Sequence, residues 1–175
     1  MSFGDNIKNS FKILGFNENS LIDISNNEKA TGFGFLTLAI AGIAMAISQL
    51  NPLGIIVNPI ALIIGLFIGY SIFHFIAKFI LGGQATGIQY FRSLSNSFVI
   101  YWITFIPIIG VYLQFIAGLW LMVINIFILH KVHKLSMAKA VILGLLPLIV
   151  LLILVFIGAF AYFGVLSPDK FIPPR

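Results

Sequence analysis

Acidic residues are missing from most of this chain, and cysteine is missing from all of it. No Asp or Glu lies between Ala30 and Pro168, which is where the apolar residues are concentrated. Carboxylates are the usual proton carriers, general bases and ligands of hard metal ions, so their absence argues against most chemistry inside a membrane. Without cysteine there is no disulfide, thiolate nucleophile or cysteine-ligated metal.

Charged residues of either sign are also scarce, because they make up 9% of the 175 residues while 60% are hydrophobic. A soluble domain has roughly 25% charged residues, so the sequence predicts an integral membrane protein with a single domain. The formal net charge is +5, and the basic residues lie next to apolar segments. Contact with anionic lipid headgroups explains this placement better than nucleic acid does, and no nucleic-acid partner is expected.

A polar leader, residues 1–30, precedes apolar segments that are long enough to cross a bilayer. A helix needs about 20 residues to cross a hydrocarbon core of about 30 Å. The sequence therefore predicts an all-α bundle of five transmembrane helices within residues 31–167, followed by an external tail of residues 168–175. The predicted spans are Gly32–Leu50, Pro59–Leu81, Leu94–Ile106, Val111–Leu129 and Ala138–Leu166. The third is only about 20 Å long, so it either begins among the headgroups or is re-entrant.

The positions of the basic residues predict how the chain is oriented. With five spans, eight of the ten Lys and Arg residues lie on the same side of the membrane, and only Lys170 and Arg175 lie opposite. The positive-inside rule then places the N-terminus in the cytoplasm and the C-terminus outside.

The leader contains a candidate amphipathic helix. Ile7, Phe11 and Leu14 fall on one face at helical spacing, and Lys8 and Lys12 flank them. Such a helix either lies in the cytoplasmic headgroup layer or packs on the cytosolic ends of the spans.

Small and polar residues inside the predicted spans are candidates for helix packing. Gly65 and Gly69 form a GxxxG pattern, which permits close approach of a helix from the same chain or from a second copy. Gln114 and Asn125 share a face of the fourth span, where they either hydrogen-bond to neighbouring helices or line a path for a solute. Pro147 should kink the fifth span. The other candidate packing residues are Pro107, Gly110 and Trp120.

Residues at the cytoplasmic ends of the predicted spans are candidates for contact with a partner or with lipid headgroups. They are Lys78, Gly82, Gly83, Arg92, Lys131, His133, Lys134, Ser136 and Lys139. His130 and His133 have roughly the spacing of metal ligands, but lysines flank them and no Cys or carboxylate lies nearby, so no metal is expected. Catalytic motifs such as Gly-x-Ser-x-Gly and His-Glu-x-x-His are absent from the sequence, and neither a cofactor nor enzymatic activity is expected.

A series of residues spread over the spans and their connections carries a family resemblance. The series comprises Lys78 before Leu81-Gly82-Gly83, a polar segment ending at Arg92, the Pro107–Gly110 turn, Trp120, and a loop with His133, Ser136 and Lys139-Ala140 that leads to Pro147. With it the chain resembles the Yip family, the Ypt/Rab-interacting membrane proteins, over most of residues 30–166. The resemblance implies a cytoplasmic leader followed by five spans.

In eukaryotes the resemblance implies vesicle traffic between the endoplasmic reticulum and the Golgi, with Rab-type GTPases as partners. The short leader, residues 1–30, lacks the Asp-Leu-Tyr-Gly-Pro motif of the family, which makes GTPase binding doubtful. The composition, rich in Ile, Asn and Lys, suggests a small prokaryotic member.

Two functions of different classes follow from these observations. The first is a non-enzymatic scaffold or adaptor in membrane organisation or trafficking-like processes, which binds anionic lipids and another membrane protein or a second copy through its cytoplasmic face. The alternative is a permease or lipid-handling protein with His74, Gln114 and Asn125 facing a cavity between helices. The lack of a carboxylate for proton or sodium coupling weighs against this alternative.

Overall fold

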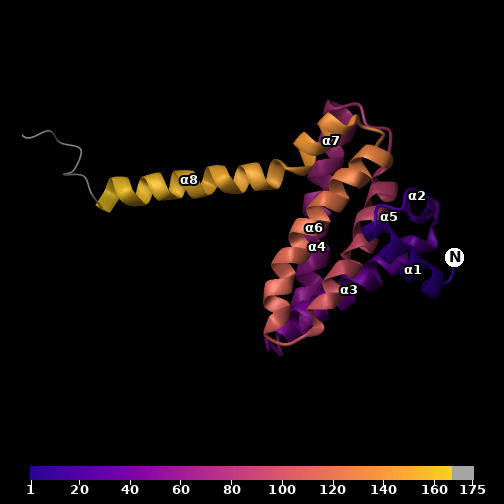
Figure 1. Cartoon of the computed structure of the whole chain (residues 1–175), viewed down its shortest axis with the longest axis horizontal. Coiled ribbons are helices and arrows are strands. Elements are labelled where there is room, and N and C mark those ends of the chain that lie inside the picture. Colours follow the sequence, from indigo (N-terminus) through magenta and orange to yellow (C-terminus); the bar gives the residue numbers. More distant parts are fainter. Residues whose placement is uncertain (167–175) are drawn as a thin grey trace, which may run out of the picture. The chain divides into compact units, whose positions relative to one another are not determined.

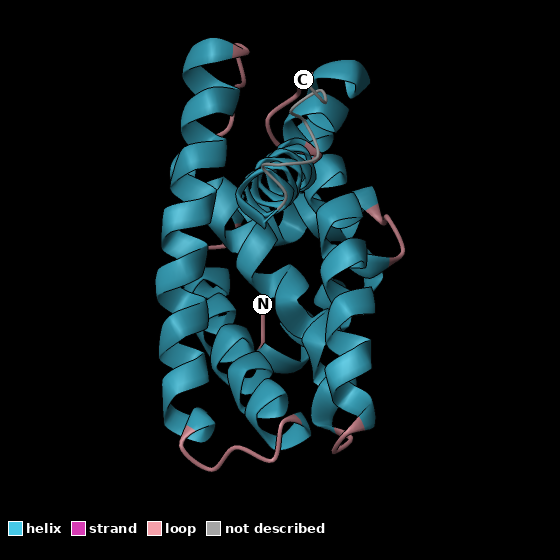
Figure 2. Cartoon of the chain, turned by 90° about the vertical axis from the view of Figure 1, so that its left-hand side faces the viewer, coloured by secondary structure: helices cyan, strands magenta, loops and turns pink. Residues whose placement is uncertain are grey.

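Helices joined by short turns make up the described part of the chain, residues 1–166, in this computed structural model (Figure 1). Figure 2 shows no strand in that part. Met1–Gly144 form one compact unit, and the second unit begins at Leu145. The predicted tail, residues 168–175, lies outside the described residues together with Lys170 and Arg175.

The leader forms two helices, α1 (Phe3–Leu14) and α2 (Glu18–Asn26). Ser2 caps α1, because its hydroxyl accepts a hydrogen bond from Asp5 N at 3.1 Å while the Asp5 carboxylate accepts one from Ser2 N. This reciprocal pair is a capping box, which satisfies two backbone donors that the helix itself leaves free. The predicted leader helix is therefore present.

Four helical segments among the described residues are long and apolar enough to cross a membrane. They are α3 (Lys29–Ser48), α4 (Gly54–Phe75) with the π-helix η1 (Ile76–Ile80), α6 (Ile109–Lys131), and the segment that holds α7 (Met137–Gly144) and α8 (Leu146–Leu166). They confirm the predicted all-α membrane protein. The last segment is interrupted at Leu145, two residues before Pro147.

The second predicted span is wrong at its N-terminal end. The α4 helix begins at Gly54, where the Asn51 side chain accepts a hydrogen bond from Gly54 N at 3.1 Å. Pro59 therefore lies inside the helix rather than at its start, and its missing N–H removes one backbone hydrogen bond.

The third predicted span has an unusual structure. It consists of the end of α5 (Gly87–Ser97) and a 3₁₀ helix, η2 (Phe98–Phe105). The 3₁₀ helix rises about 2.0 Å per residue rather than 1.5 Å, so the two helices each extend about 16 Å and together reach about 32 Å. This combined length matches the hydrocarbon thickness, although neither helix alone would cross it.

Hydrogen bonds place the two ends of the α5–η2 segment at opposite ends of the bundle. Gln89 Nε2 donates to Asn26 Oδ1 at 2.9 Å near the start of α3. Ile108 N donates to Ser48 O at 2.9 Å at the other end of α3. The segment therefore runs alongside α3 from end to end. The count of five transmembrane spans stays a prediction, because four helical segments have the length and composition of a span.

The α3 and α4 helices approach so closely that their backbones touch at Gly42. A Cβ atom at Gly42 would lie 2.6 Å from the Cα of Pro59, which is closer than van der Waals contact allows. Gly65 and Gly69 differ, because a Cβ there would meet no atom of residues 1–144 within 4 Å. Their GxxxG pattern does not mediate a contact within this unit, and contact with a second copy stays a prediction.

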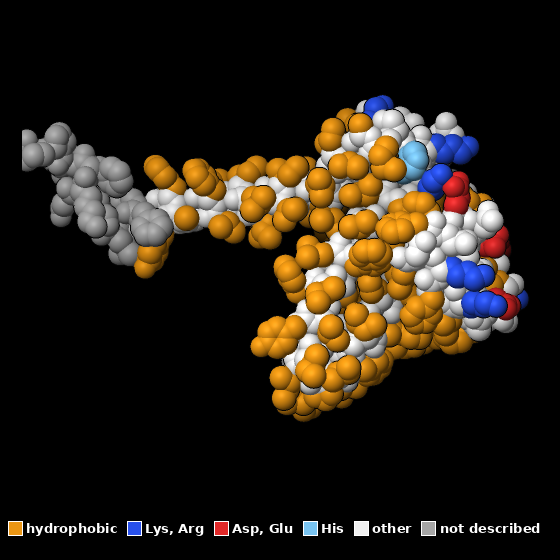
Figure 3. All heavy atoms as spheres, viewed as in Figure 1, with side chains coloured by type: hydrophobic (Ala, Val, Ile, Leu, Met, Phe, Trp, Pro, Cys, Tyr) orange, Lys and Arg blue, Asp and Glu red, His pale blue; other side chains and the backbone are white. Residues whose placement is uncertain are grey.

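Charged side chains gather over the leader and the adjoining end of the bundle on the face that Figure 3 shows, and hydrophobic side chains cover the remainder of the bundle on that face. Gln49 and Leu50, at the other end of α3, are uncharged, as are the next residues up to Gly54. The two ends of the unit therefore differ in charge, and the assignment of one end to the cytoplasm stays a prediction.

Replacing Gly42 with Ala should lower the melting temperature of the purified protein in detergent, because the added methyl group forces α3 and α4 apart. Overpacking of this kind costs about 1–3 kcal/mol. The matched control is Gly32→Ala in the same helix, where the added Cβ meets nothing within 4 Å. Equal melting temperatures for the two variants would contradict the backbone contact at Gly42.

Candidate functional site

Three segments that are far apart in the sequence meet at one end of the unit. They are the leader, the loop of residues 81–86 that follows η1, and the turn of residues 132–136 between α6 and α7. Lys131 Nζ forms an ion pair with Glu18 Oε2 at 2.6 Å, and Lys139 Nζ donates to Leu81 O at 3.0 Å. We call this end, with residues 81–86, 131–139 and α2, the basic end.

Gly83 allows the loop and the turn to touch. Its N–H donates to Ala77 O at 2.7 Å, and Gln84 N donates to His133 O at 2.9 Å. A Cβ at Gly83 would lie 2.6 Å from His133 Nδ1, so any larger residue would displace the histidine. Gly82 has a φ of +81°, which L-residues with a side chain rarely adopt. The structure therefore gives both predicted glycines a definite role in loop geometry.

His133 lies at the centre of a buried polar cluster and is 0% exposed. Its Nε2 lies 3.3 Å from His74 Nδ1, and its ring meets the Tyr90 ring edge-on at a centroid distance of 5.1 Å. Burial, together with the smaller effects of the neighbouring His74 and Lys78, lowers the pKa of His133 to about 4. The imidazole is therefore neutral at physiological pH, and its Nδ1 has no hydrogen-bond partner within the described residues.

Tyr90 connects this cluster to α6. Its hydroxyl donates to Asn125 Oδ1 at 2.6 Å, and burial raises the pKa of the phenol. The described residues contain no group of three or more His, Cys, Asp or Glu side chains that could hold a metal ion. His74 of α4, Tyr90 of α5 and His133 of the turn contact one another, and Tyr90 also bonds to α6. These contacts join α4, α5 and α6 around the turn.

Arg92 is half-buried and forms hydrogen bonds within the protein. Its Nε donates to Thr31 Oγ1 at 2.8 Å, and its Nη1 donates to Ser25 O at 3.3 Å. It thereby ties α5 to α2 and to the first turn of α3. The sequence analysis named Arg92 as a candidate for contact with a partner or with headgroups, and the structure gives it a structural role as well.

The remaining predicted residues differ in their accessibility. Lys134 is exposed and Lys78 is half-buried. Ser136 is exposed and accepts a hydrogen bond from Lys139 N at 3.5 Å. His130 Nδ1 donates to Leu135 O at 2.7 Å, which closes the turn after α6. Lys131 and Lys139 already have partners within the unit, so Lys134 is the predicted lysine of the turn whose exposed side chain can meet a ligand or partner.

Two asparagines that sequence analysis did not single out hold the leader on the bundle. Asn6 and Asn96 are fully buried, and Asn6 Nδ2 donates to Asn96 Oδ1 at 2.6 Å. The polar residues Ser95, Asn96 and Ser97 near the start of the otherwise apolar predicted span were the available signal. Buried polar groups need hydrogen-bond partners, and Asn96 finds two of them outside its own helix.

The α1 helix combines the two arrangements that the sequence left open. The face with Asn6, Ser10 and Ile13 is buried against the protein, whereas on the predicted stripe Phe11 is 48% exposed and Ile7 and Leu14 are half-buried. The leader is also held by Trp120, whose Nε1 donates to Leu14 O at 3.1 Å. Phe11 can therefore reach the headgroup layer while the helix stays docked.

The polar residues of α6 form hydrogen bonds between helices. Gln114 Nε2 donates to Ser48 Oγ at the end of α3, and Asn125 accepts from Tyr90. Both side chains are thus used in packing. These contacts favour the hydrogen-bonding interpretation over a solute path.

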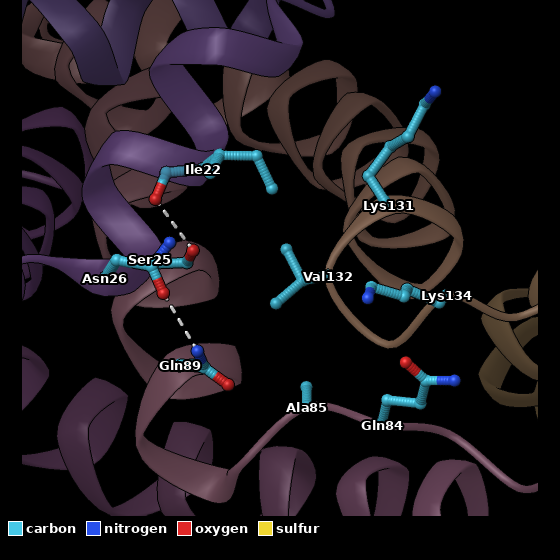
Figure 4. A pocket seen from close by; sticks show the side chains of 9 residues that line it. All are labelled: Ile22, Ser25, Asn26, Gln84, Ala85, Gln89, Lys131, Val132 and Lys134. Carbon is cyan, nitrogen blue, oxygen red and sulfur yellow. Dashed lines mark hydrogen bonds between the residues drawn. The ribbon is translucent and has the colours of Figure 1, made fainter.

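A pocket of about 350 Å³ opens at the basic end (Figure 4). It is bounded by α2, the loop of residues 81–86, α5, the last residue of α6 and the turn that follows α6. Its lining residues are Ile22, Ser25, Asn26, Gln84, Ala85, Gln89, Lys131, Val132 and Lys134. The volume lies within the range of small-molecule sites.

Comparison with known protein families identifies this architecture. The sequence matches the Yip1 domain over residues 19–159, from α2 into α8. The chain belongs to the Yip1 family. No curated protein and no solved structure matches it significantly. The pocket and the buried histidine cluster both lie within the matched Yip1 domain, whereas α1 precedes it.

The His133 environment predicts a loss of stability in acid. An unfolded histidine takes up a proton near pH 6.5, whereas the folded His133 resists protonation down to about pH 4. Stability is thus fully present above pH 6.5 and declines as the pH falls toward 4, by about 1–3 kcal/mol. Melting temperatures measured across this range should decline less steeply in His133→Gln than in the wild type. His130→Gln is the control, and it should keep the wild-type slope.

Replacing Tyr90 with Phe should destabilise the Yip1 domain by about 1–3 kcal/mol, because Asn125 Oδ1 would lose its donor in a buried site. The double variant Tyr90→Phe/Asn125→Leu removes both polar partners and should recover part of that loss. Chemical denaturation in detergent would measure these changes. The pairing would be contradicted if the free energies of unfolding lost in the two single variants, Tyr90→Phe and Asn125→Leu, simply added up in the double variant.

Proposed function

We propose that this Yip1-family protein is a non-enzymatic membrane scaffold or adaptor that meets its partner at the basic end. The observation that carries the proposal is the convergence of the leader, the loop of residues 81–86 and the turn of residues 132–136 on one surface. Yip1-family proteins are not known as enzymes. A surface built from three segments and supported by a rigid bundle suits recognition of another macromolecule.

The charge pattern supports a cytoplasmic position for this surface. Lys131, Lys134 and Lys139 lie within nine residues of one another, immediately after the apolar α6. Juxtamembrane lysines are attracted to the anionic cytoplasmic leaflet, at about 1 kcal/mol each. In this arrangement the N-terminus is cytoplasmic, and the exposed Phe11 of α1 rests in the same headgroup layer.

The ion pair between Lys131 and Glu18 gives the surface a defined form. It joins α6 to the first turn of α2, so the leader and the transmembrane helices present one continuous face. A partner that binds here contacts the leader and the turn together. The role in membrane organisation or trafficking-like processes rests on this face and on membership of the Yip1 family.

Replacing Lys131, Lys134 and Lys139 together with Ala should reduce the yield of a stoichiometric protein partner, or of a defined homo-oligomer, by several-fold. The measurement is affinity purification of the full chain from native nanodiscs, with mass spectrometry of the bound proteins. The matched control replaces Lys8, Lys12 and Lys29, which removes the same charge from outside the basic end.

Two results would contradict the scaffold. One is a partner whose yield is the same in both triple variants. The other is a single bound lipid or solute with no protein partner, which would favour the permease or lipid-handling function.

A further inference from the structure

The pocket at the basic end has a composition that neither membership of the family nor the scaffold function explains. Its lining contains two lysines, three amide side chains and a serine, and it contains no Asp or Glu. A surface between helices that served only for packing would be lined by apolar groups. We propose that this pocket binds the phosphate group of an anionic ligand. The inference rests on the proposed function, because it assigns a ligand to the same cytoplasmic face.

The hydrogen bonds within the lining leave donors free. Asn26 uses its carbonyl oxygen to accept from Gln89 Nε2. Gln89 uses its own oxygen to accept from Thr86, and the Ser25 hydroxyl donates to Ile22 O. Among the described residues, the amide nitrogens of Asn26 and Gln84 have no acceptor. A phosphate offers only acceptors at neutral pH, so it complements this set of free donors.

The two lysines have different roles. Lys131 is paired with Glu18, whereas Lys134 has no ion pair within residues 1–166. Figure 4 shows the ammonium group of Lys134 pointing toward the middle of the pocket, while the side chain of Lys131 extends away from it. Lys134 is therefore the group that would neutralise a bound anion.

The backbone at Lys134 is strained. Its φ is +56°, in the left-handed region that favours Gly or Asn. Residues held in this region cost about 1 kcal/mol or more, and such strain gathers at sites that bind ligands. Gly or Asn would close the turn at lower cost. The same reasoning makes Lys134→Asn a variant that should fold at least as well as the wild type.

The location suits a phosphate that comes from the membrane. The pocket adjoins Lys131, the last residue of α6, and α2, which immediately precedes α3. It thus lies just beyond the ends of two membrane-spanning helices, which is the level of the lipid headgroups. A soluble phosphate ester has the same chemistry and reaches the pocket from the cytoplasm. The two sources are separated by the experiment.

The test measures the affinity of the purified full chain, in a neutral detergent, for four probes by isothermal titration calorimetry. The probes are short-chain phosphatidic acid, short-chain phosphatidylcholine, glycerol 3-phosphate and inorganic phosphate. Phosphatidic acid should bind at one site per chain, and Lys134→Asn should weaken that binding by about tenfold. Gln84→Ala should weaken it by a smaller factor. The control Lys29→Asn removes the same charge outside the pocket and should leave the affinity unchanged.

Each outcome decides a point. Phosphatidic acid binding without glycerol 3-phosphate binding assigns the pocket to a lipid headgroup, and equal affinities assign it to a soluble phosphate ester. Equal binding of phosphatidylcholine and phosphatidic acid, an unchanged affinity in Lys134→Asn, or no binding of any probe overturns the proposal. The yield of a protein partner with Lys134→Asn is measured separately. Loss of the scaffold function would appear in that yield, whereas failure of the phosphate site would appear in the calorimetric affinities.

Discussion

The side-chain amide of Asn96 joins the leader, α3 and α5, and the arrangement of the basic end depends on it. Its Nδ2 donates to Ala30 O at 2.9 Å and to Arg92 O at 2.8 Å, while its Oδ1 accepts from Asn6 Nδ2 at 2.6 Å. A buried amide without partners costs several kcal/mol in an apolar environment, so the three segments hold one another in register. The same requirement explains why α5 can be polar and still lie within the bundle.

The leader follows from this constraint. Because Asn6 bonds to Asn96, the face of α1 with Asn6, Ser10 and Ile13 turns inward, and Phe11 lies on the exposed side. A docked helix with an exposed aromatic side chain suits an interface between protein, headgroups and water. The position of α2 follows in turn, since a short connection joins it to α1, and α2 forms one wall of the pocket.

The extent to which the sequence predicted this structure depends on the range of the forces involved. A membrane span is recognised from the hydropathy of about 20 consecutive residues, so α3, α6 and the last apolar segment were predictable. The start of α4 was not, because the helix begins at Gly54, whose N–H bonds to Asn51, and includes Pro59 in its interior. The α5–η2 segment has too few apolar residues for a span, and its burial depends on Asn6 and Ala30, which lie far away in the sequence. The basic residues of the site were predictable, but the pocket was not, because four separate segments form it.

The turn between α6 and α7 brings the buried cluster and the pocket into one structure. His133 points inward and is fully buried, whereas the adjacent Lys134 is exposed and lines the pocket. The Gln84 N–H to His133 O bond fixes the same turn from the opposite side. A neutral His133 can remain between His74 and Tyr90, but a protonated one would carry an uncompensated charge in a buried site. The turn therefore keeps a neutral His133 inside the bundle and presents the side chain of Lys134 to the pocket.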